Sequence, residues 1–196
     1  MNLRDTYPQP IPRAVLKVQA EIDAHMRAFI ARSPFLCLGT SSAAGADVTP
    51  RGDAPGFVHV LDDHTLLLPD WPGNNRLDTL GNVQENPAVA LLFFVPGVQE
   101  TLRVNGRAEI SMDPALIARW DVGGKHPRSV LKVQVAEAFM HCGKALIRSR
   151  LWAADAQIDR TALPSYGQIL KDQTKLPDSA EDMQRSLEDG YRNRLY

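Results

Sequence analysis

The sequence predicts an α+β protein, mainly β, in which a closed antiparallel barrel is decorated by helices. Six or seven short apolar segments recur at fairly even spacing along the 196 residues, and this spacing is typical of barrel strands. Most links between these segments are too short to hold a crossover helix, so repeated βαβ units are excluded. Helical periodicity is found near the start, in the middle and near the end of the chain.

The N-terminal segment predicts an extended arm followed by a helix. Three prolines keep residues 1–12 extended, and the last of them, Pro12, suits the first turn of the helix that follows. Apolar side chains spaced for one helical face predict a single helix over residues 13–33. The Ser33-Pro34 step ends this helix, because the residue before a proline disfavours helical geometry.

A change from helical spacing to short apolar runs predicts the strands of the barrel. The run 88–95 is apolar throughout, so we expect it to be buried on both faces. Asp62-Asp63 marks a hairpin turn, and the long alternating strand is broken at Asn105-Gly106. The predicted strands are 35–40, 48–51, two around the turn within 56–69, then 88–95, 100–111 and 129–142.

Further helices are predicted between and after these strands. Asp113 can cap a short helix over residues 113–120, and another helix is expected over 143–152. Residues 153–196 are polar and predict a partly ordered C-terminal extension, with a helix around residues 180–192. We expect the whole chain, 1–196, to form a single domain, because its length suits one core.

The composition excludes several classes of function. A net charge of −1, with Lys and Arg spread along the chain, argues against a nucleic-acid binder and against a membrane-surface role. No apolar run approaches the ~20 residues of a membrane helix, and the polar N-terminus is no signal peptide. The two cysteines, Cys37 and Cys142, predict a reducing cytoplasm rather than a disulfide scaffold. The spacing of His and Cys predicts no metal site.

The stretch "PGNNRLDTL" is a first candidate for ligand binding. Pro72-Gly73 predicts a turn, and Asn75 can cap a helix that starts at Arg76, with Asp78 completing a capping box. The first turn of such a helix offers free N–H groups and the positive end of a dipole, and a guanidinium matches a phosphate. An ordinary capped helix with a solvated Arg76 explains this stretch equally well.

The stretch "TPRGDAPG" is the second candidate. Arg51 follows a strand, Gly52 allows a close approach of the backbone to a ligand, and Asp53 could pair with Arg51 or orient it. Taken alone, a surface loop with a weak ion pair explains it better. Taken together, the two loops lie where barrel strands end, so one anionic ligand could meet Arg51 and Arg76 at once.

The order of these motifs resembles that of the pyridoxamine 5′-phosphate oxidase-related flavoproteins, which have the FMN-binding split-barrel fold. The likeness covers roughly residues 13–152 and includes "PRGDAPG", "PDWPGNNR", "TLRVNG" and the closing "HCGKALIRSRLW". It implies a homodimer with FMN in two equivalent clefts at the interface.

The resemblance also implies site residues, one motif at a time. Residues of "VTPRGD" would lie beside the isoalloxazine ring, with Arg51 at the phosphate or the pyrimidine edge. "LPDWPGNNR" would hold ring and phosphate, and "TLRVNG" would come from the partner subunit. The cofactor-binding residues implied are Thr49, Pro50, Arg51, Gly52, Asp53, Pro69, Asp70, Asn74, Asn75, Arg76, Arg103, Asn105 and Lys144.

The motifs depart from those of authentic pyridoxamine phosphate oxidases. "TPRGDAP" and "NNR" stand where those enzymes carry "RMVLLK"-like and "SRK" residues, and their basic C-terminal substrate motif has no clear match. We therefore expect an FMN-dependent oxidoreductase acting on an unidentified small molecule, with no catalytic residue assigned. A non-catalytic flavin or haem binding or storage protein of the same fold is the alternative, and a scaffold dimer without a ligand is the third hypothesis.

Overall fold

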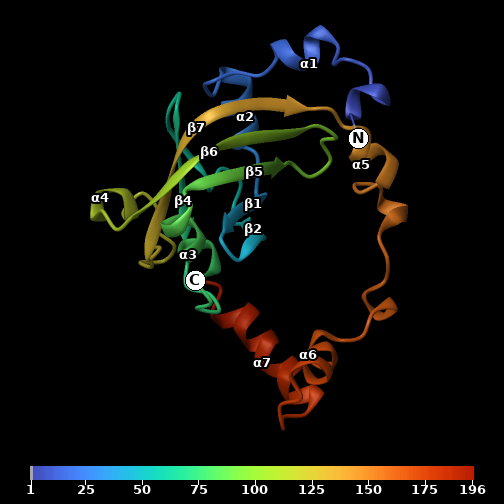
Figure 1. Cartoon of the computed structure of the whole chain (residues 1–196). Coiled ribbons are helices and arrows are strands. Elements are labelled where there is room, and N and C mark those ends of the chain that lie inside the picture. Colours follow the sequence, from blue (N-terminus) through green and yellow to red (C-terminus); the bar gives the residue numbers. More distant parts are fainter. Residues whose placement is uncertain (1) are drawn as a thin grey trace. The chain divides into compact units, whose positions relative to one another are not determined.

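The computed structural model describes residues 2–196 (Figure 1). These fall into two compact units, one ending at Trp152 and one spanning Ala153–Tyr196. The bounds of the second unit coincide with those of the predicted C-terminal extension. None of the helices in the described residues is long and apolar enough to cross a membrane.

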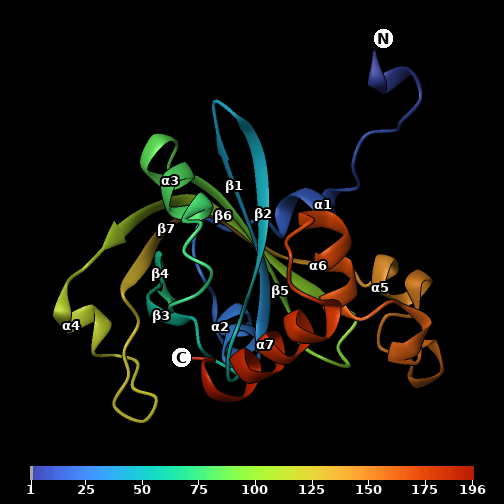
Figure 2. The ribbon, with the colours of Figure 1, turned by 90° about the horizontal axis from the view of Figure 1, so that it is seen from below.

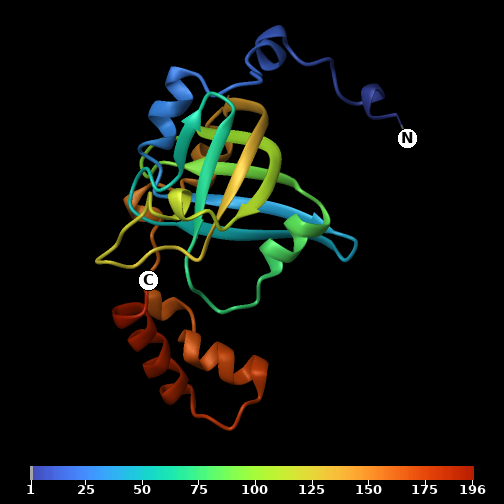
Figure 3. The same ribbon diagram turned by 90° about the vertical axis from the view of Figure 1, so that its left-hand side faces the viewer.

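A seven-stranded antiparallel sheet forms the first unit, in the order β2-β1-β5-β6-β7-β4-β3. The α+β prediction is thereby confirmed. The sheet curls strongly on itself (Figure 3), but in the described residues β2 and β3 are its two ends and share no ladder. The barrel is therefore split between them, as the family resemblance implied, and not closed as the strand pattern alone predicted. The strands are β1 (Phe35–Ser42), β2 (Gly45–Gly52), β3 (His59–Asp62), β4 (Thr65–Asp70), β5 (Ala88–Phe94), β6 (Thr101–Ser111) and β7 (Ser129–His141).

The core lies on one face of this sheet, because apolar and less buried positions alternate along the strands. In β5, Val89, Leu91 and Phe93 are buried, whereas Ala88 and Ala90 are exposed. Within a single chain this strand is therefore buried on one face, and not on both faces as predicted. Its outward positions are occupied by small or apolar side chains, which sequence periodicity does not distinguish from core residues.

Two short helices replace the single helix predicted over residues 13–33. They are α1 (Pro12–Leu16), with the predicted proline in its first turn, and α2 (Ala24–Ile30), capped by the Asp23 carboxylate, which accepts from the Met26 N–H. Between them, Gln19 exchanges two backbone hydrogen bonds with Ala138 of β7, at 2.9 and 2.8 Å. This bridge holds the intervening chain extended, so tertiary pairing overrides the helical pattern.

The predicted break at Asn105-Gly106 is confirmed as a shift in the β6–β7 register. Gly106 is required there, because a Cβ at this position would overlap the backbone of Gln134. The bulge lets β6 pair with β7 on both sides of it, from Thr101↔His141 to Ser111↔Val130.

The remaining helices of the first unit are α3 (Asp78–Glu85), α4 (Pro114–Ile117) and α5 (Lys144–Ser149). The predicted cap of α4 is confirmed, since the Asp113 carboxylate accepts from the Ala115 N–H.

The second unit contains α6 (Tyr166–Thr174) and α7 (Ala180–Asn193), which lie side by side (Figure 2). The helix predicted around residues 180–192 is confirmed as α7, whereas α6 was not predicted. Single-turn 3₁₀ helices lie at Leu3–Asp5, Ala154–Ala156 and Arg160–Ala162.

Candidate anion-binding site

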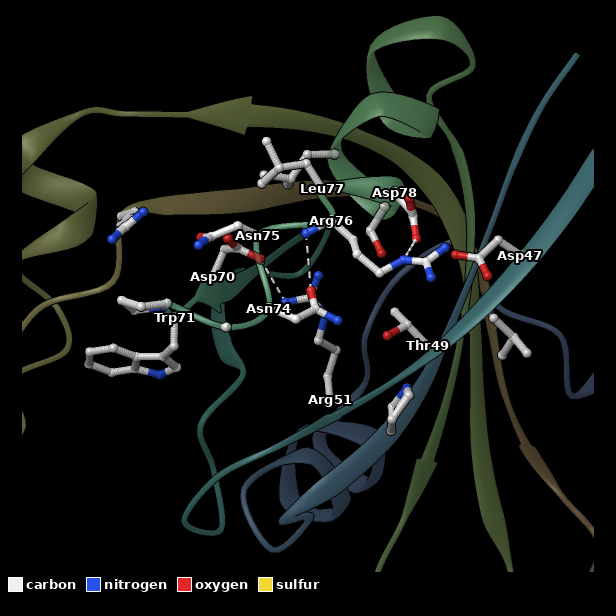
Figure 4. Close-up of a pocket in the computed structure, with 17 residues that line it drawn as sticks. Asp47, Thr49, Arg51, Asp70, Trp71, Asn74, Asn75, Arg76, Leu77 and Asp78 are labelled. Carbon is white, nitrogen blue, oxygen red and sulfur yellow. Dashed lines mark hydrogen bonds and ion pairs between the residues drawn. The ribbon is translucent and has the colours of Figure 1, made fainter. Parts of the chain in front are cut away.

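Residues of both candidate stretches line one pocket of about 360 Å³ (Figure 4). Arg51 was expected in a loop after a strand, but it lies within β2. One wall is the part of β2 from Asp47 to Arg51, and the other is the segment from Asp70 to Leu80, which links the end of β4 to α3. Arg128, just before β7, completes the lining. Arg51 and Asp70, the nearest residues of the two walls in the chain, are 19 positions apart, and the curl of the sheet brings the walls together.

The β2 wall is an end strand of the sheet. It pairs with β1 along its whole length, and its other edge carries no ladder in the described residues. Pro50 lies within this strand, opposite Cys37. A proline is tolerated at a sheet edge, where its missing N–H interrupts no inner ladder. The outer edge of β2 therefore offers main-chain polar groups to whatever occupies the pocket.

An ion pair joins the two walls. The Arg51 Nη1 donates to the Asp70 Oδ1 at 2.7 Å, and only 21% and 16% of the two side chains are exposed. This low exposure distinguishes the pair from an ordinary surface salt bridge. The Arg51 Nε is buried and has no hydrogen-bond partner in the described part of the chain. Arg51 thus retains donor capacity that a bound anion can use.

A second link joins Trp71 of the pocket wall to Asp53, the residue directly after β2. The indole Nε1 donates to the Asp53 Oδ2 at 3.0 Å. Asp53 thus accepts a hydrogen bond from Trp71, and the Arg51 guanidinium pairs with Asp70. Trp71 lines the pocket as well, so its indole is both a loop anchor and part of the pocket wall.

The turn before α3 differs from the prediction. We expected Asn75 to cap a helix starting at Arg76, but α3 begins at Asp78, and its N-cap, Leu77, makes no side-chain capping bond. Asn75 and Leu77 adopt positive φ angles of 59° and 61°, which interrupt any helix there. The Asn74 Oδ1 accepts from the Arg76 N–H at 3.1 Å and stabilises this turn.

Arg76 is held at the mouth of the pocket by Asp78. Its Nε donates to the Asp78 Oδ2 at 2.7 Å, and the side chains are 74% and 49% exposed. The hydrogen bond and charge of Asp78, with a smaller contribution from Asp47, raise the pKa of Arg76 above its ordinary value. Asp78 therefore does not complete the expected capping box and instead orients the guanidinium.

Arg128 is a pocket residue that the sequence analysis missed. Its backbone N–H donates to the Asp70 carbonyl oxygen at 3.0 Å, which places it beside the start of the Trp71 loop. Its only sequence signal is its position directly before an apolar strand, after Pro127. An exposed Arg in that position is common on protein surfaces, so the pattern alone does not point to a site.

The other residues implied by the resemblance do not line this pocket. Three of them lie near it: Gly52 approaches Pro34, Asp53 binds Trp71, and Pro69 is buried in β4. The remaining three lie elsewhere in the chain. Arg103 covers the Phe139 ring at 5.1 Å, the Asn105 Nδ2 donates to the Glu137 Oε1 at 2.6 Å, and Lys144 begins α5.

The geometry defines a class of protein: a split antiparallel barrel with an arginine-containing pocket beside an end strand of its sheet. A sequence model described as pyridoxamine 5′-phosphate oxidase matches residues 22–142, well over half of the chain. The chain therefore belongs to the pyridoxamine 5′-phosphate oxidase family. The match ends before the second unit begins. A search of curated proteins returned no match.

Two solved structures of HupZ support the same fold. The chain is similar to HupZ from Group A Streptococcus, with a TM-score of 0.51 and 18% identity over 62% of this chain and 98% of that one. A variant of HupZ gives a TM-score of 0.50 and 20% identity over 61% and 98% of the two chains. An FMN-binding protein from Syntrophomonas wolfei matches at a TM-score of 0.46 and 13% identity, over 58% of this chain and 82% of that one.

Proposed function

We propose that the protein binds FMN in this pocket and is an FMN-dependent oxidoreductase acting on a small molecule. The observation that carries the proposal is the convergence of Arg51, from β2, and Arg76, from the segment before α3, on one pocket of a family member. Two guanidiniums can neutralise a phosphate monoester, because their planar donor forks match phosphate oxygens.

The pocket residues fit FMN. The buried Nε of Arg51 supplies a donor that has no partner in residues 2–196. The positive φ angles of Asn75 and Leu77 favour backbone N–H groups that turn toward one side, as in anion-binding nests. The volume of about 360 Å³ lies within the range of about 300–1,000 Å³ usual for small-molecule sites.

The residues that one chain supplies to the pocket favour flavin over haem. Its lining, as far as the structure describes it, includes no His, Cys, Met or Tyr, the side chains that hold haem iron from the protein. The edge of β2 instead suits a flat heteroaromatic group that exchanges main-chain hydrogen bonds.

Bound FMN would supply the hydride and electron transfer, and the chain's own residues would bind, orient and tune it. Arg51 and Arg76 would hold the phosphate. Thr49 and Pro50 would contact the ring through the backbone, and Asp70 would keep Arg51 in place. A guanidinium near the ring would stabilise negative charge that develops there on reduction.

A homodimer is part of this proposal. The β6 side chains of Arg103 and Asn105 lie outside the pocket of their own chain, and they would reach the flavin of a partner subunit. We also propose that the protein is located in the cytoplasm.

The test begins with FMN binding. The purified full-length chain should quench the fluorescence of added FMN, and saturating FMN should raise its melting temperature by mass action. A colourless protein whose melting temperature does not change when FMN is added would contradict the proposal. The oxidoreductase part is tested separately, by asking whether bound FMN passes electrons from NADH or NADPH to acceptors faster than free FMN. A rate no faster than that of free FMN would leave the binding or storage alternative.

A further inference from the structure

We propose that Trp71 and Arg128 form a second subsite of the pocket, one that binds a planar aromatic carboxylate. The assignment of this molecule as the substrate rests on the proposed FMN-dependent function. The existence of the subsite does not, because it follows from side chains of this chain alone.

The first observation is a difference among the three guanidiniums that line the pocket. Arg51 is paired with Asp70 and Arg76 with Asp78. Arg128 lines the same pocket and is exposed, and its side chain makes no hydrogen bond or ion pair in the described residues. Its charge is therefore available to a ligand without displacing a carboxylate of the protein.

The second observation is an aromatic wall next to that charge. The Arg128 N–H donates to the Asp70 carbonyl oxygen, which belongs to the peptide bond between Asp70 and Trp71. The Trp71 indole is half-buried, lines the pocket and is fixed by its bond to Asp53. A ring held in this way favours stacking with another flat ring, and little side-chain freedom is lost on binding.

The third observation is that this corner is separate from the proposed phosphate position. Figure 4 shows Trp71 at one end of the pocket and Asp47 at the other, near Arg76. Because FMN carries a single phosphate, a guanidinium at the Trp71 end is left for the anion of another molecule. A lone guanidinium suits a carboxylate, whose single charge it balances and whose two oxygens match its fork.

The test uses benzoate and benzyl alcohol, which differ only in the anionic group. Each is titrated by calorimetry into the full-length protein, once as purified and once after saturation with FMN. Benzoate should bind measurably in both forms, and benzyl alcohol at least about 10-fold more weakly, because it lacks the charge-assisted hydrogen bonds. Equal binding of the two probes would overturn the subsite, and so would loss of benzoate binding when FMN is present.

Variants localise the effect. Arg128→Gln should weaken benzoate binding about 10- to 100-fold, and Arg128→Lys should recover part of the loss, since it restores charge without the fork. Lys132→Gln is the control, because Lys132 is a half-buried cation of β7 that lies outside the pocket and pairs with Glu109. Equal benzoate affinity in Arg128→Gln and the wild type would refute the proposal.

A third probe tests the aromatic wall. Benzoate should bind more tightly than acetate in the wild type, and this difference should shrink in Trp71→Leu, whose folding is checked by its melting temperature. An unchanged difference would remove Trp71 from the subsite. Tighter binding of inorganic phosphate than of benzoate, with the same dependence on Arg128, would overturn the carboxylate assignment. Benzoate binding by a protein that does not bind FMN would support the subsite and contradict the proposed function.

Discussion

The Arg51 guanidinium contacts the Asp70 carboxylate at 2.7 Å, and this ion pair connects two strands that are not neighbours in the sheet. Arg51 lies near the end of β2, and Asp70 is the last residue of β4. Four strands separate β2 from β4 in the sheet order, so the contact depends on the curl of the sheet. The pair therefore stabilises both the fold at the split and the shape of the pocket.

We predict that breaking this pair destabilises the protein by about 1–3 kcal/mol, between the values for exposed and buried ion pairs. Arg51→Met or Asp70→Leu should each do so, because each leaves a partly buried charge without its partner. The double variant should lose less than the sum of the two. Urea unfolding of the four proteins gives the coupling free energy.

The exposed pair Arg27–Asp63 supplies the control for this cycle. Its side chains are 41% and 65% exposed, so its coupling should be no more than about 1 kcal/mol. Additive effects at Arg51 and Asp70 would show that the two side chains do not stabilise each other.

A second prediction concerns Arg76. Arg76→Ala should weaken FMN binding by about 1–3 kcal/mol if the guanidinium pairs with the phosphate. Arg185→Ala is a closely matched control: Arg185 and Asp182 are 72% and 53% exposed, against 74% and 49% for Arg76 and Asp78. Fluorescence titration measures both affinities. An FMN affinity in Arg76→Ala equal to that of Arg185→Ala would remove Arg76 from the phosphate site.

The sequence predicted the strands well, because turn residues and changes in periodicity bound them. The hairpin at Asp62-Asp63, the break at Asn105-Gly106 and the cap at Asp113 are all local signals, and the structure confirms each. The prediction of a single first helix was wrong because a long-range contact, and not a local signal, determines the structure there. The pairing of Gln19 with Ala138 joins residues more than a hundred positions apart, and no local pattern encodes it.

In the pocket too, local signals were predicted correctly and long-range contacts were not. The composition of the two loops singled out Arg51 and Arg76, and both line the pocket. The partners of these arginines could not be chosen from sequence, since Asp53 is closer to Arg51 in the chain than Asp70 is. Arg128 joins the pocket through the pairing of β4 with β7, which places Ser129 opposite Asp70. That register is a long-range property of the fold.

A third prediction compares two glycines. Gly106→Ala should destabilise the protein by more than about 2 kcal/mol, because the added methyl group would overlap the Gln134 backbone at the β6 bulge. Gly81→Ala should stabilise it by about 0.5–1 kcal/mol, because Gly81 lies inside α3 and nothing stands within 4 Å of the added Cβ. Urea unfolding distinguishes the two. Equal stabilities would contradict the bulge geometry.

The final prediction concerns His59 and pH. Its ring stacks on that of Trp120 with centroids 4.1 Å apart and planes 6° from parallel, and its buried Nδ1 has no hydrogen-bond partner among residues 2–196. Burial, and then the charge of Arg119, lower the pKa of His59 below the usual 6.5. As the pH falls below 6.5, the His59 imidazole therefore binds a proton in the unfolded chain before it does so in the folded protein. The contribution of His59 to stability is therefore complete above pH 6.5 and is lost as the pH falls through the folded pKa.

His59→Phe retains a ring that can stack on Trp120 but cannot titrate, so its stability should fall less than that of the wild type between about pH 7.5 and 5. Urea unfolding at a series of pH values measures both curves. Because other groups titrate equally in the two proteins, the difference between the curves isolates His59. His25→Gln, which removes an exposed histidine of α2, controls for the loss of one imidazole. Parallel curves for His59→Phe and the wild type would mean that His59 is protonated as readily in the folded protein as in the unfolded chain.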